Sequence, residues 1–279
     1  MIMKNPITFE NMDIDIKPKQ DDLFDALILE GIVDKREKWS TYKFGDMNVP
    51  RVSEILKDCI GKDYLMKWAL NLGKEAYNRE STDTLITGTI VHEMIEHFLL
   101  YGVKKEVNYK SYRMRMRTEK AYLNFLSWYR NMINNGYEIT PLYIEKETVC
   151  PWYGGTIDCG MNIKHEKYNI DRNYIVDFKT SKQISIDYFL QTYAYLWSEH
   201  FNKHYFDPSI PEIHGIGIIR IDKEQNRYED IFLDYNDTEK SRILDDINVA
   251  FSSMLNWYYH IINLNYDLRM SKKFKGELR

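Results

Sequence analysis

The segment YIVDFK, residues 174–179, places an aspartate and a lysine two positions apart among apolar residues. Successive side chains of a β-strand point to opposite faces, so Asp177 and Lys179 would share one face. Val176 and Phe178 would pack on the other. A carboxylate and an ammonium are costly to bury without a purpose. The simpler alternative is an ion pair on the solvated face of an edge strand.

A second acid stands in the segment GGTIDCGMNI, residues 154–163, where Asp158 is the one charge on the polar face of a half-buried strand. If this strand pairs with residues 173–179 as a hairpin, Asp158 and Asp177 approach within metal-bridging distance. Two like charges that close repel each other unless a cation lies between them. Oxygen ligands favour Mg²⁺ or Mn²⁺, which keep several waters for a substrate phosphate.

His92 adds a nitrogen ligand on an amphipathic helix that we expect over residues 87–101, with Thr87 as its N-cap. It lies away from the apolar stripe, with Glu96 one turn further along, and a surface histidine is the commoner interpretation. The stretch HEMIE is close to the HExxH zinc motif, but Glu96 stands where the second histidine is needed. A metalloprotease is therefore disfavoured, while a zinc hydrolase built on His92, Glu93 and Glu96 remains an alternative.

Gln191 and Tyr195 are four residues apart on a helix predicted over residues 186–203, so they share a face. Alone, this pair is also typical of the rim of a hydrophobic core. The sequence contains no GxxxxGK[ST] motif and no GxSxG motif, which argues against a P-loop motor and a serine hydrolase.

The elements that would position these residues follow from hydrophobic periodicity. Residues 1–48 are acidic and we expect them to be irregular, with one short helix at 21–31. The order of the remaining elements indicates an α/β fold. The sequence predicts helices at 53–60, 62–78, 87–101, 112–134, 186–203 and 237–262, and strands near 140–149, 155–163, 173–179, 213–221 and 227–234.

The composition excludes several classes of protein. The chain has 279 residues, with 38 Lys and Arg against 42 Asp and Glu, so it does not coat nucleic acid by bulk charge alone. The cysteines Cys59, Cys150 and Cys159 lack CxxC spacing, so we expect neither a disulfide framework nor an iron–sulfur cluster. No signal peptide or membrane helix is visible, which predicts a soluble, cytoplasmic protein without a membrane partner.

A basic segment follows the His92 helix, with Tyr109 and Tyr112 interleaved among its cations. Such a segment could line a channel, with cations on phosphates and tyrosines stacked on bases. The alternative is an ordinary solvated face. The cations are Lys104, Lys105, Lys110, Arg113, Arg115, Arg117 and Lys120.

Four of these segments, taken in order, resemble the motifs of the PD-(D/E)XK nuclease superfamily. They are GTIVHEMIE (88–96), GGTIDCGMNI (154–163), YIVDFKTSK (174–182) and LQTYAYLW (190–197). More narrowly, they resemble its RecB-like branch, close to phage exonucleases and the mitochondrial genome maintenance exonuclease. Residues 49–73 also resemble the N-terminal helical region of that branch.

The resemblance implies roles for the matching residues. His92, Asp158 and Asp177 would hold Mg²⁺ or Mn²⁺. Lys179 would position the attacking water and stabilise the charge that develops on the phosphate. A lysine beside two carboxylates stays charged, which favours positioning and electrostatics over general-base action.

Gln191 and Tyr195 match the QxxxY motif that faces the catalytic site, and Glu96 and Glu147 are further candidates. The resemblance implies a metal-dependent DNA exonuclease acting on single strands or ends, alongside replication, recombination or repair proteins. For a phage protein, the location would be the host cytoplasm. A nucleic-acid binding module without catalysis, built on the same fold, is the alternative.

The resemblance also implies the domain organisation. Residues 1–279 would form one nuclease domain, with an acidic and helical elaboration over residues 1–85. Residues 86–235 would form the PD-(D/E)XK core, an α/β unit with a central mixed sheet flanked by helices. Residues 236–279 would add a C-terminal helix and a basic tail.

Overall fold

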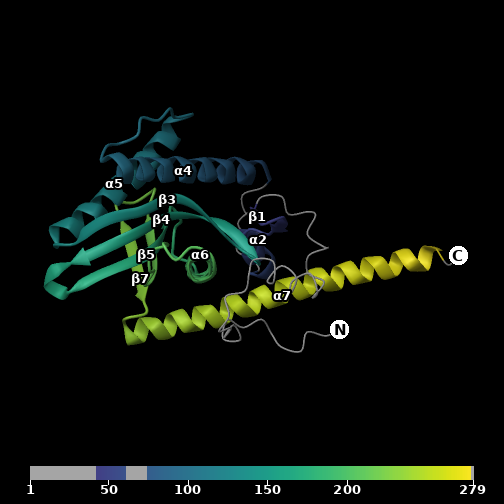
Figure 1. Cartoon of the computed structure of the whole chain (residues 1–279). Coiled ribbons are helices and arrows are strands. Elements are labelled where there is room, and N and C mark those ends of the chain that lie inside the picture. The colour runs from purple at the N-terminus through teal and green to yellow at the C-terminus, as the bar shows by residue number, and fades with distance from the viewer. Residues whose placement is uncertain (1–41, 61–73, 278–279) are drawn as a thin grey trace.

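The computed structural model describes residues 42–60 and 74–277. Within them, helices flank a sheet whose strand order is β3-β4-β5-β6-β7 (Figure 1). The elements in chain order are β1 (Tyr42–Phe44), β2 (Met47–Val49), α2 (Val52–Cys59), α4 (Lys74–Tyr101), α5 (Tyr112–Asn134), β3 (Glu138–Cys150), β4 (Tyr153–His165), η3 (Glu166–Tyr168), β5 (Ile170–Lys179), α6 (Ile186–Tyr205), β6 (Gly215–Ile221), β7 (Tyr228–Asp234) and α7 (Thr238–Glu277).

The five-stranded sheet is mixed. β3, β4 and β5 form an antiparallel meander, and β6 and β7 are antiparallel to each other. β5 and β6 are parallel. Parallel neighbours need a crossover connection, and α6 supplies it. The predicted α/β class with a central mixed sheet flanked by helices is therefore confirmed.

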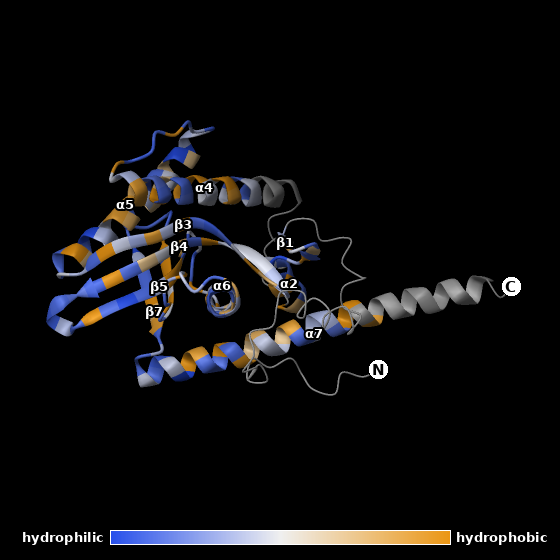
Figure 2. Cartoon of the chain, viewed as in Figure 1, coloured by the Kyte–Doolittle hydropathy of each residue, from blue (hydrophilic) through white to orange (hydrophobic). Residues whose placement is uncertain are grey.

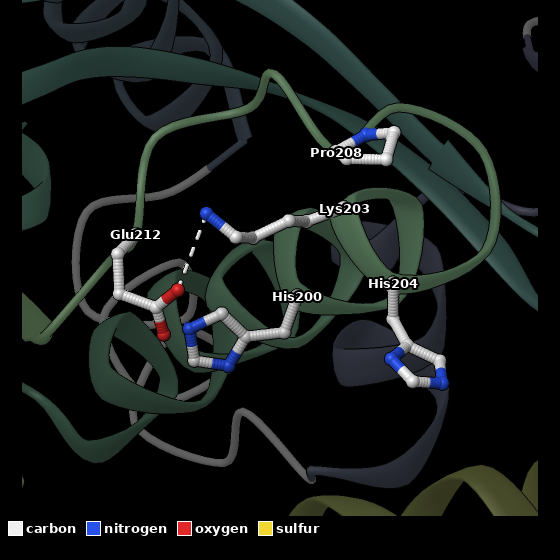
Figure 3. Close-up of a pocket in the computed structure, with 5 residues that line it drawn as sticks. All are labelled: His200, Lys203, His204, Pro208 and Glu212. Carbon is white, nitrogen blue, oxygen red and sulfur yellow. Dashed lines mark ion pairs between the residues drawn. The ribbon is translucent and has the colours of Figure 1, made fainter.

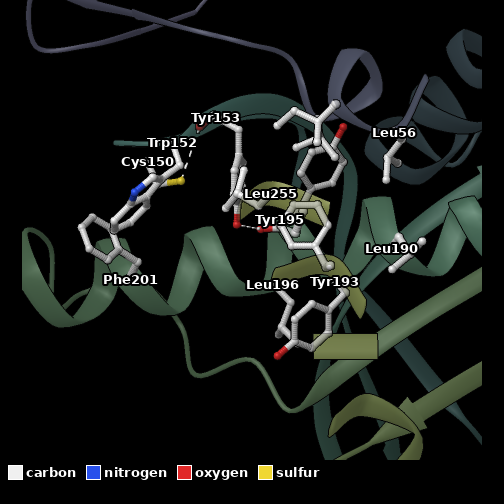
Figure 4. Close-up of a cluster of buried hydrophobic side chains, with 14 of the residues drawn as sticks. Leu56, Cys150, Trp152, Tyr153, Leu190, Tyr193, Tyr195, Leu196, Phe201 and Leu255 are labelled. Atoms are coloured by element: carbon white, nitrogen blue, oxygen red, sulfur yellow. Dashed lines mark hydrogen bonds between the residues drawn. The ribbon is translucent and has the colours of Figure 1, made fainter. Parts of the chain in front are cut away.

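Helices cover both faces of the sheet. α4 and α5 pack on one face, where Val91 and Phe125 are buried against Val176 of β5. α6 and α7 lie on the other side, where Tyr195 and Leu255 belong to a second buried cluster (Figures 1 and 4). Apolar and polar residues alternate around the turns of α4 and α7, as expected for helices with one buried face (Figure 2).

Most of the predicted elements are confirmed, several of them with longer bounds. α5 begins and ends at the predicted residues, and α2, α6 and the five sheet strands lie where periodicity placed them. α7 continues to Glu277 rather than ending near residue 262. The helix predicted at 21–31 lies outside the described residues, as do residues 61–73.

The N-terminal boundary predicted for the His92 helix was wrong. α4 begins at Lys74, so Thr87 lies inside the helix rather than at its cap. The Thr87 hydroxyl donates a hydrogen bond of 2.7 Å to the carbonyl oxygen of Asp83 one turn earlier. Residues 74–86 contain neither Gly nor Pro, so nothing in them ends a helix.

The segment 42–48, expected to be irregular, contributes a β1–β2 hairpin. Its apolar side chains are buried, and Phe44 packs edge-on against Phe201 and Phe206. Gly45 takes a φ of 57° at the turn, which glycine adopts without a steric penalty. Strands of three residues are too short for a period-two pattern to identify them.

Among the described helices, none is long and apolar enough to cross a membrane.

Candidate metal centre

A cleft of about 620 Å³ opens beside the middle of α4, where this helix passes over β3, β4 and the end of β5. The loop after β5, the start of α6 and the β6–β7 turn complete its wall. Three of the residues predicted from sequence to do chemistry, His92, Asp158 and Lys179, line it together. The other lining residues are Thr84, Leu85, Gly88, Thr89, Glu93, Glu96, Glu145, Thr180, Ser181, Tyr188 and Lys223.

Asp158 and Asp177 face each other across neighbouring strands, as the sequence predicted. The last paired residues of the β4–β5 ladder are Cys159 and Val176, so Asp158 and Asp177 come next along the two strands. Oδ2 of Asp158 accepts a hydrogen bond of 2.9 Å from the backbone N–H of Phe178. This bond fixes one oxygen of the carboxylate against β5.

β4 changes its packing at Asp158. Ile157 belongs to the α6-side cluster, whereas Cys159 and Met161 belong to the α4-side cluster, although the three residues have the same parity. Simple alternation would have placed all three on one face. The strand therefore twists across the site, and Asp158 stands where the side changes.

α4 brings His92 to this point. Nδ1 of His92 lies 3.4 Å from Oδ2 of Asp158, and its ring contacts Phe178 edge-on. Val91 and Ile95 on the same helix are buried in the core beneath, so packing fixes the rotation of α4. The half-buried histidine is thereby held at the cleft.

Glu145, which no sequence motif indicated, completes a cluster of metal-binding side chains. Ligand atoms of His92, Glu145 and Asp158 all lie within 4.8 Å of one another. Ile144 pairs with Cys159 and Lys146 with Ile157, which puts Glu145 opposite Asp158. Glu145 has a φ of 47°, a left-handed conformation that is uncommon for a residue other than glycine and clusters at functional sites.

The two carboxylates of this cluster, Glu145 and Asp158, repel each other. Partial desolvation and the neighbouring Asp158 raise the pKa of the Glu145 carboxyl above its usual value, and Glu96 adds to the shift. A divalent cation would relieve this repulsion. One histidine nitrogen and the oxygens of two carboxylates are ligands that fit a hard metal ion.

Behind the cluster, Asp177 and Lys179 form a close ion pair. Nζ of Lys179 donates to Oδ1 of Asp177 at 2.7 Å, and Asp177 is 2% exposed. Burial raises the pKa of Asp177 to about 6, although Lys179 opposes the shift. Burial alone would lower the pKa of Lys179, but Asp177 and Asp158 together raise it. The lysine is charged at neutral pH.

Asp177 has one oxygen without a partner. Its Oδ2 is buried and accepts no hydrogen bond among the described residues. A buried carboxylate oxygen in this state is costly unless a donor or a cation satisfies it. Asp177 lies outside the group of His92, Glu145 and Asp158 whose ligand atoms are within 4.8 Å of one another, so its role as a metal ligand stays a prediction.

Gln191 and Tyr195 lie behind the cleft rather than on its wall. Nε2 of Gln191 donates to the Tyr195 hydroxyl at 3.0 Å, and Tyr195 is buried among the side chains shown in Figure 4. The ring of Tyr195 packs so tightly on Gly155 that a Cβ there would lie 2.2 Å from it. Burial raises the pKa of Tyr195, and the nearby charge of Asp177 raises it further, while Lys179 opposes the shift.

The predicted basic segment is largely neutralised by acidic side chains. Four of its seven cations form ion pairs, and Lys120 donates to the carbonyl oxygen of Glu224 at 3.1 Å. The exposed Lys110 and Arg115 form no ion pair among the described residues. A role for this segment in binding nucleic acid stays a prediction. The pairs are Lys104–Glu119, Lys105–Glu93, Arg113–Glu80, and Arg117 with both Glu80 and Glu224.

The residues of the alternative zinc site, His92, Glu93 and Glu96, all line the cleft, but only His92 belongs to the cluster with metal-binding geometry. Glu93 pairs with Lys105 at 3.0 Å, and Glu96 lines the cleft outside the three-residue cluster. A second hollow of about 390 Å³ contains His200 and His204. Their rings point in different directions, and Lys203 pairs with Glu212 there (Figure 3). Within the described residues, His92, Glu145 and Asp158 are the group with metal-binding geometry.

Comparison of the whole sequence with protein families finds no match, and comparison with curated proteins finds no significant match.

Proposed function

We propose that this chain is a metal-dependent nuclease of the PD-(D/E)XK type, a DNA exonuclease that acts on single strands or ends. One observation carries the proposal. A cluster of two carboxylates and a histidine lies in a cleft beside the buried ion pair of Asp177 and Lys179. Hydrolysis of a phosphodiester needs both parts, a divalent cation and a fixed positive charge near the attacked phosphorus.

The cation would be held by His92, Glu145 and Asp158, with Asp177 as a further carboxylate. When bound, Mg²⁺ or Mn²⁺ polarises a phosphoryl oxygen and lowers the pKa of water. Hard cations prefer carboxylate oxygens, which these strands supply from three positions. Glu145 is thus an addition to the ligand set inferred from sequence.

Lys179 would act as a charged group rather than as a base. Its carboxylate neighbours raise its pKa, so it does not accept a proton near neutral pH. Its ammonium is held at 2.7 Å from Asp177 and lies 5.1 Å from the ring centre of Tyr188. Held from two sides at the wall of the cleft, it can orient water and offset charge on the phosphate.

The arrangement of the sheet supports the same proposal. The carboxylates come from three adjacent strands, β3, β4 and β5, and the histidine from a helix packed across them. Sites on strands and helices are held more precisely than sites on loops. Gln191 and Tyr195 brace the site from α6, which accounts for a QxxxY motif at this place.

The test is release of nucleotides from labelled linear DNA and RNA in Mg²⁺, Mn²⁺ or Zn²⁺. Wild type should degrade linear DNA in Mg²⁺ or Mn²⁺, and Lys179→Ala and Asp177→Ala should lose at least about a hundredfold in rate. Lys164→Ala, at the far end of the β4–β5 hairpin, is the matched control and should keep full activity. Equal rates for all four proteins on every substrate would refute the proposal.

Labelled 5′ and 3′ ends, and circular against linear DNA, distinguish exonuclease from endonuclease action. A protein that binds DNA in every metal without cutting it would instead be the binding module. Activity restricted to Zn²⁺ would favour the hydrolase alternative.

A further inference from the structure

Lys223 is a buried lysine that the proposed reaction does not use. It lies in the turn between β6 and β7, is 9% exposed, and lines the same cleft as His92 and Lys179. Among the described residues it forms no ion pair and no side-chain hydrogen bond. Most of the side chain is desolvated, while the residue lines the cleft, where an entering anion can reach it.

The turn that carries Lys223 is rigidly built. Oδ1 of Asp222 accepts hydrogen bonds from the backbone N–H groups of Glu224 and Gln225, at 2.8 and 2.9 Å. From α5, the buried Asn124 donates to the carbonyl oxygens of Asp222 and Gln225, both at 2.7 Å. The lysine is therefore presented by a fixed turn and not by a loose loop.

The acids on either side of Lys223 in the chain, Asp222 and Glu224, are already engaged. Glu224 lies 2.6 Å from Arg117, which also pairs with Glu80 at 2.8 Å. Asp222 pairs with the fully buried Arg220 at 3.2 Å. None of these carboxylates makes an ion pair with Lys223.

Charges of both signs surround Lys223. Burial lowers the pKa of Lys223, as do the charges of Arg117 and Lys182, whereas Glu224 and Glu80 raise it. Arg220 also donates to the carbonyl oxygen of Ser181 at 3.1 Å. This bond ties the loop after Lys179 to β6, three residues before Lys223.

We propose that Lys223 binds an anionic group of the substrate, namely a backbone phosphate next to the one that is cleaved. The inference rests on the proposed function, because the metal cluster and Lys179 would engage the scissile phosphate in the same cleft. A strand lying there brings a second phosphate one nucleotide away. Such a contact positions the strand and carries no sequence preference.

The first experiment measures binding of a fluorescent single-stranded oligonucleotide by anisotropy, in Ca²⁺ and at several salt concentrations. Lys223→Gln should weaken binding about tenfold and reduce the salt slope by about 0.7, as for the loss of one phosphate contact. Lys223→Arg should stay within about threefold of wild type because it keeps the charge. Lys164→Gln, an exposed lysine at the far end of the hairpin, should bind as wild type.

Steady-state kinetics give a second signature. If Lys223 positions the strand, Lys223→Gln should raise KM about tenfold and change kcat by less than about threefold. A loss confined to kcat would overturn the inference, as would oligonucleotide binding equal to that of wild type.

A third experiment separates this inference from the proposed function. Inorganic pyrophosphate, added without metal, should raise the Tm of wild type and Lys223→Arg but not that of Lys223→Gln. If wild type cuts no nucleic acid yet shows this pattern, the anion site stands and the nuclease proposal fails. If pyrophosphate stabilises Lys223→Gln as much as wild type, the anion site is refuted whatever the activity.

Discussion

Replacing Glu145 with glutamine tests the metal centre at the residue that the sequence did not reveal. Glu145 is one of three side chains whose ligand atoms lie within 4.8 Å of one another. Glutamine keeps the size and one oxygen of the side chain but removes its charge. We expect weaker Mn²⁺ binding and a folded state that, without metal, is as stable as wild type or slightly more so, because Asp158 no longer faces a like charge.

The magnitude follows from the charge removed. A divalent ion about 4 Å from a unit charge gains about 8 kcal/mol at an effective dielectric constant of about 20. Glu145 is exposed and glutamine retains an oxygen ligand, so we expect a net loss nearer to about 2 kcal/mol. That loss raises the Kd for Mn²⁺ about 30-fold.

Thermal unfolding with and without Mn²⁺ measures how much the bound metal stabilises each protein. At about 100 times the wild-type Kd, Mn²⁺ should stabilise the wild-type fold by about 2.7 kcal/mol, and a 30-fold weaker site by about 0.9 kcal/mol. For a domain of this size, the rise in Tm should fall from about 5–10 °C to about 2–4 °C. Isothermal titration calorimetry gives the two Kd values directly.

Glu147→Gln is the matched control. Glu147 is an exposed glutamate on the same strand, two residues along, and lies outside the cluster. It should keep the full Mn²⁺ shift. Equal shifts for Glu145→Gln and wild type would refute the assignment of Glu145 as a ligand. The absence of any shift in wild type would refute the metal centre itself.

Three further changes probe the elements behind the cluster. Lys179→Ala leaves the buried carboxylate of Asp177 without its partner, so we expect a loss of about 3 kcal/mol in urea unfolding. Because the raised pKa of Asp177 is about 6, its ionised form is lost as the pH falls through 6, and Mn²⁺ affinity should drop by up to about tenfold per pH unit below that value in calorimetry. Gly155→Ala places a Cβ against the Tyr195 ring and should cost about 1–3 kcal/mol in urea unfolding.

Gly155→Ala has a matched control in α4. Gly88→Ala meets Thr180 only at an ordinary 3.5 Å and should stabilise α4 by about 0.5–1 kcal/mol. If Gly155→Ala loses no more stability than Gly88→Ala in urea unfolding, the Tyr195 ring does not pack tightly on Gly155. Unchanged stability of Lys179→Ala would mean that the ion pair contributes nothing to the fold. If the affinity for Mn²⁺ does not change between pH 5 and pH 7.5, Asp177 does not take part in binding the metal.

Strong periodicity made much of the fold predictable from sequence. α5 was predicted at its observed bounds because its buried residues recur at helical spacing from Met114 to Trp128. The pairing of Asp158 with Asp177 followed from two apolar strands separated by a polar turn. Helix starts were less predictable, since Thr87 has the residue type of a cap but lies within an unbroken helix.

Glu145 could not be found from sequence because its neighbourhood carries no local signal. It is one of two glutamates in the strand segment YIEKETV, and nothing in that stretch distinguishes it from Glu147. Its place in the cluster comes from the register of β3 on β4 and from its left-handed backbone, which only the folded structure fixes.

The burial of Lys223 could not be predicted from sequence either. In sequence it belongs to the polar turn IDKEQN, which is typical of a solvated connection. It is buried because Asn124 of α5 and the ion pairs of Arg117 pull this turn onto the body of the protein. Contacts between residues about a hundred positions apart decide its exposure, and no local pattern encodes them.

The rate of nucleotide release from linear DNA, measured against Mg²⁺ or Mn²⁺ concentration for wild type and Asp158→Asn, decides whether the cleft is a metal-dependent nuclease site. Asp158 belongs to the metal cluster, faces Asp177 and lines the cleft. We predict saturable, metal-dependent release by wild type and a loss of at least about a hundredfold in Asp158→Asn, which should remain folded. Metal-independent release, or equal rates for the two proteins, would contradict the account.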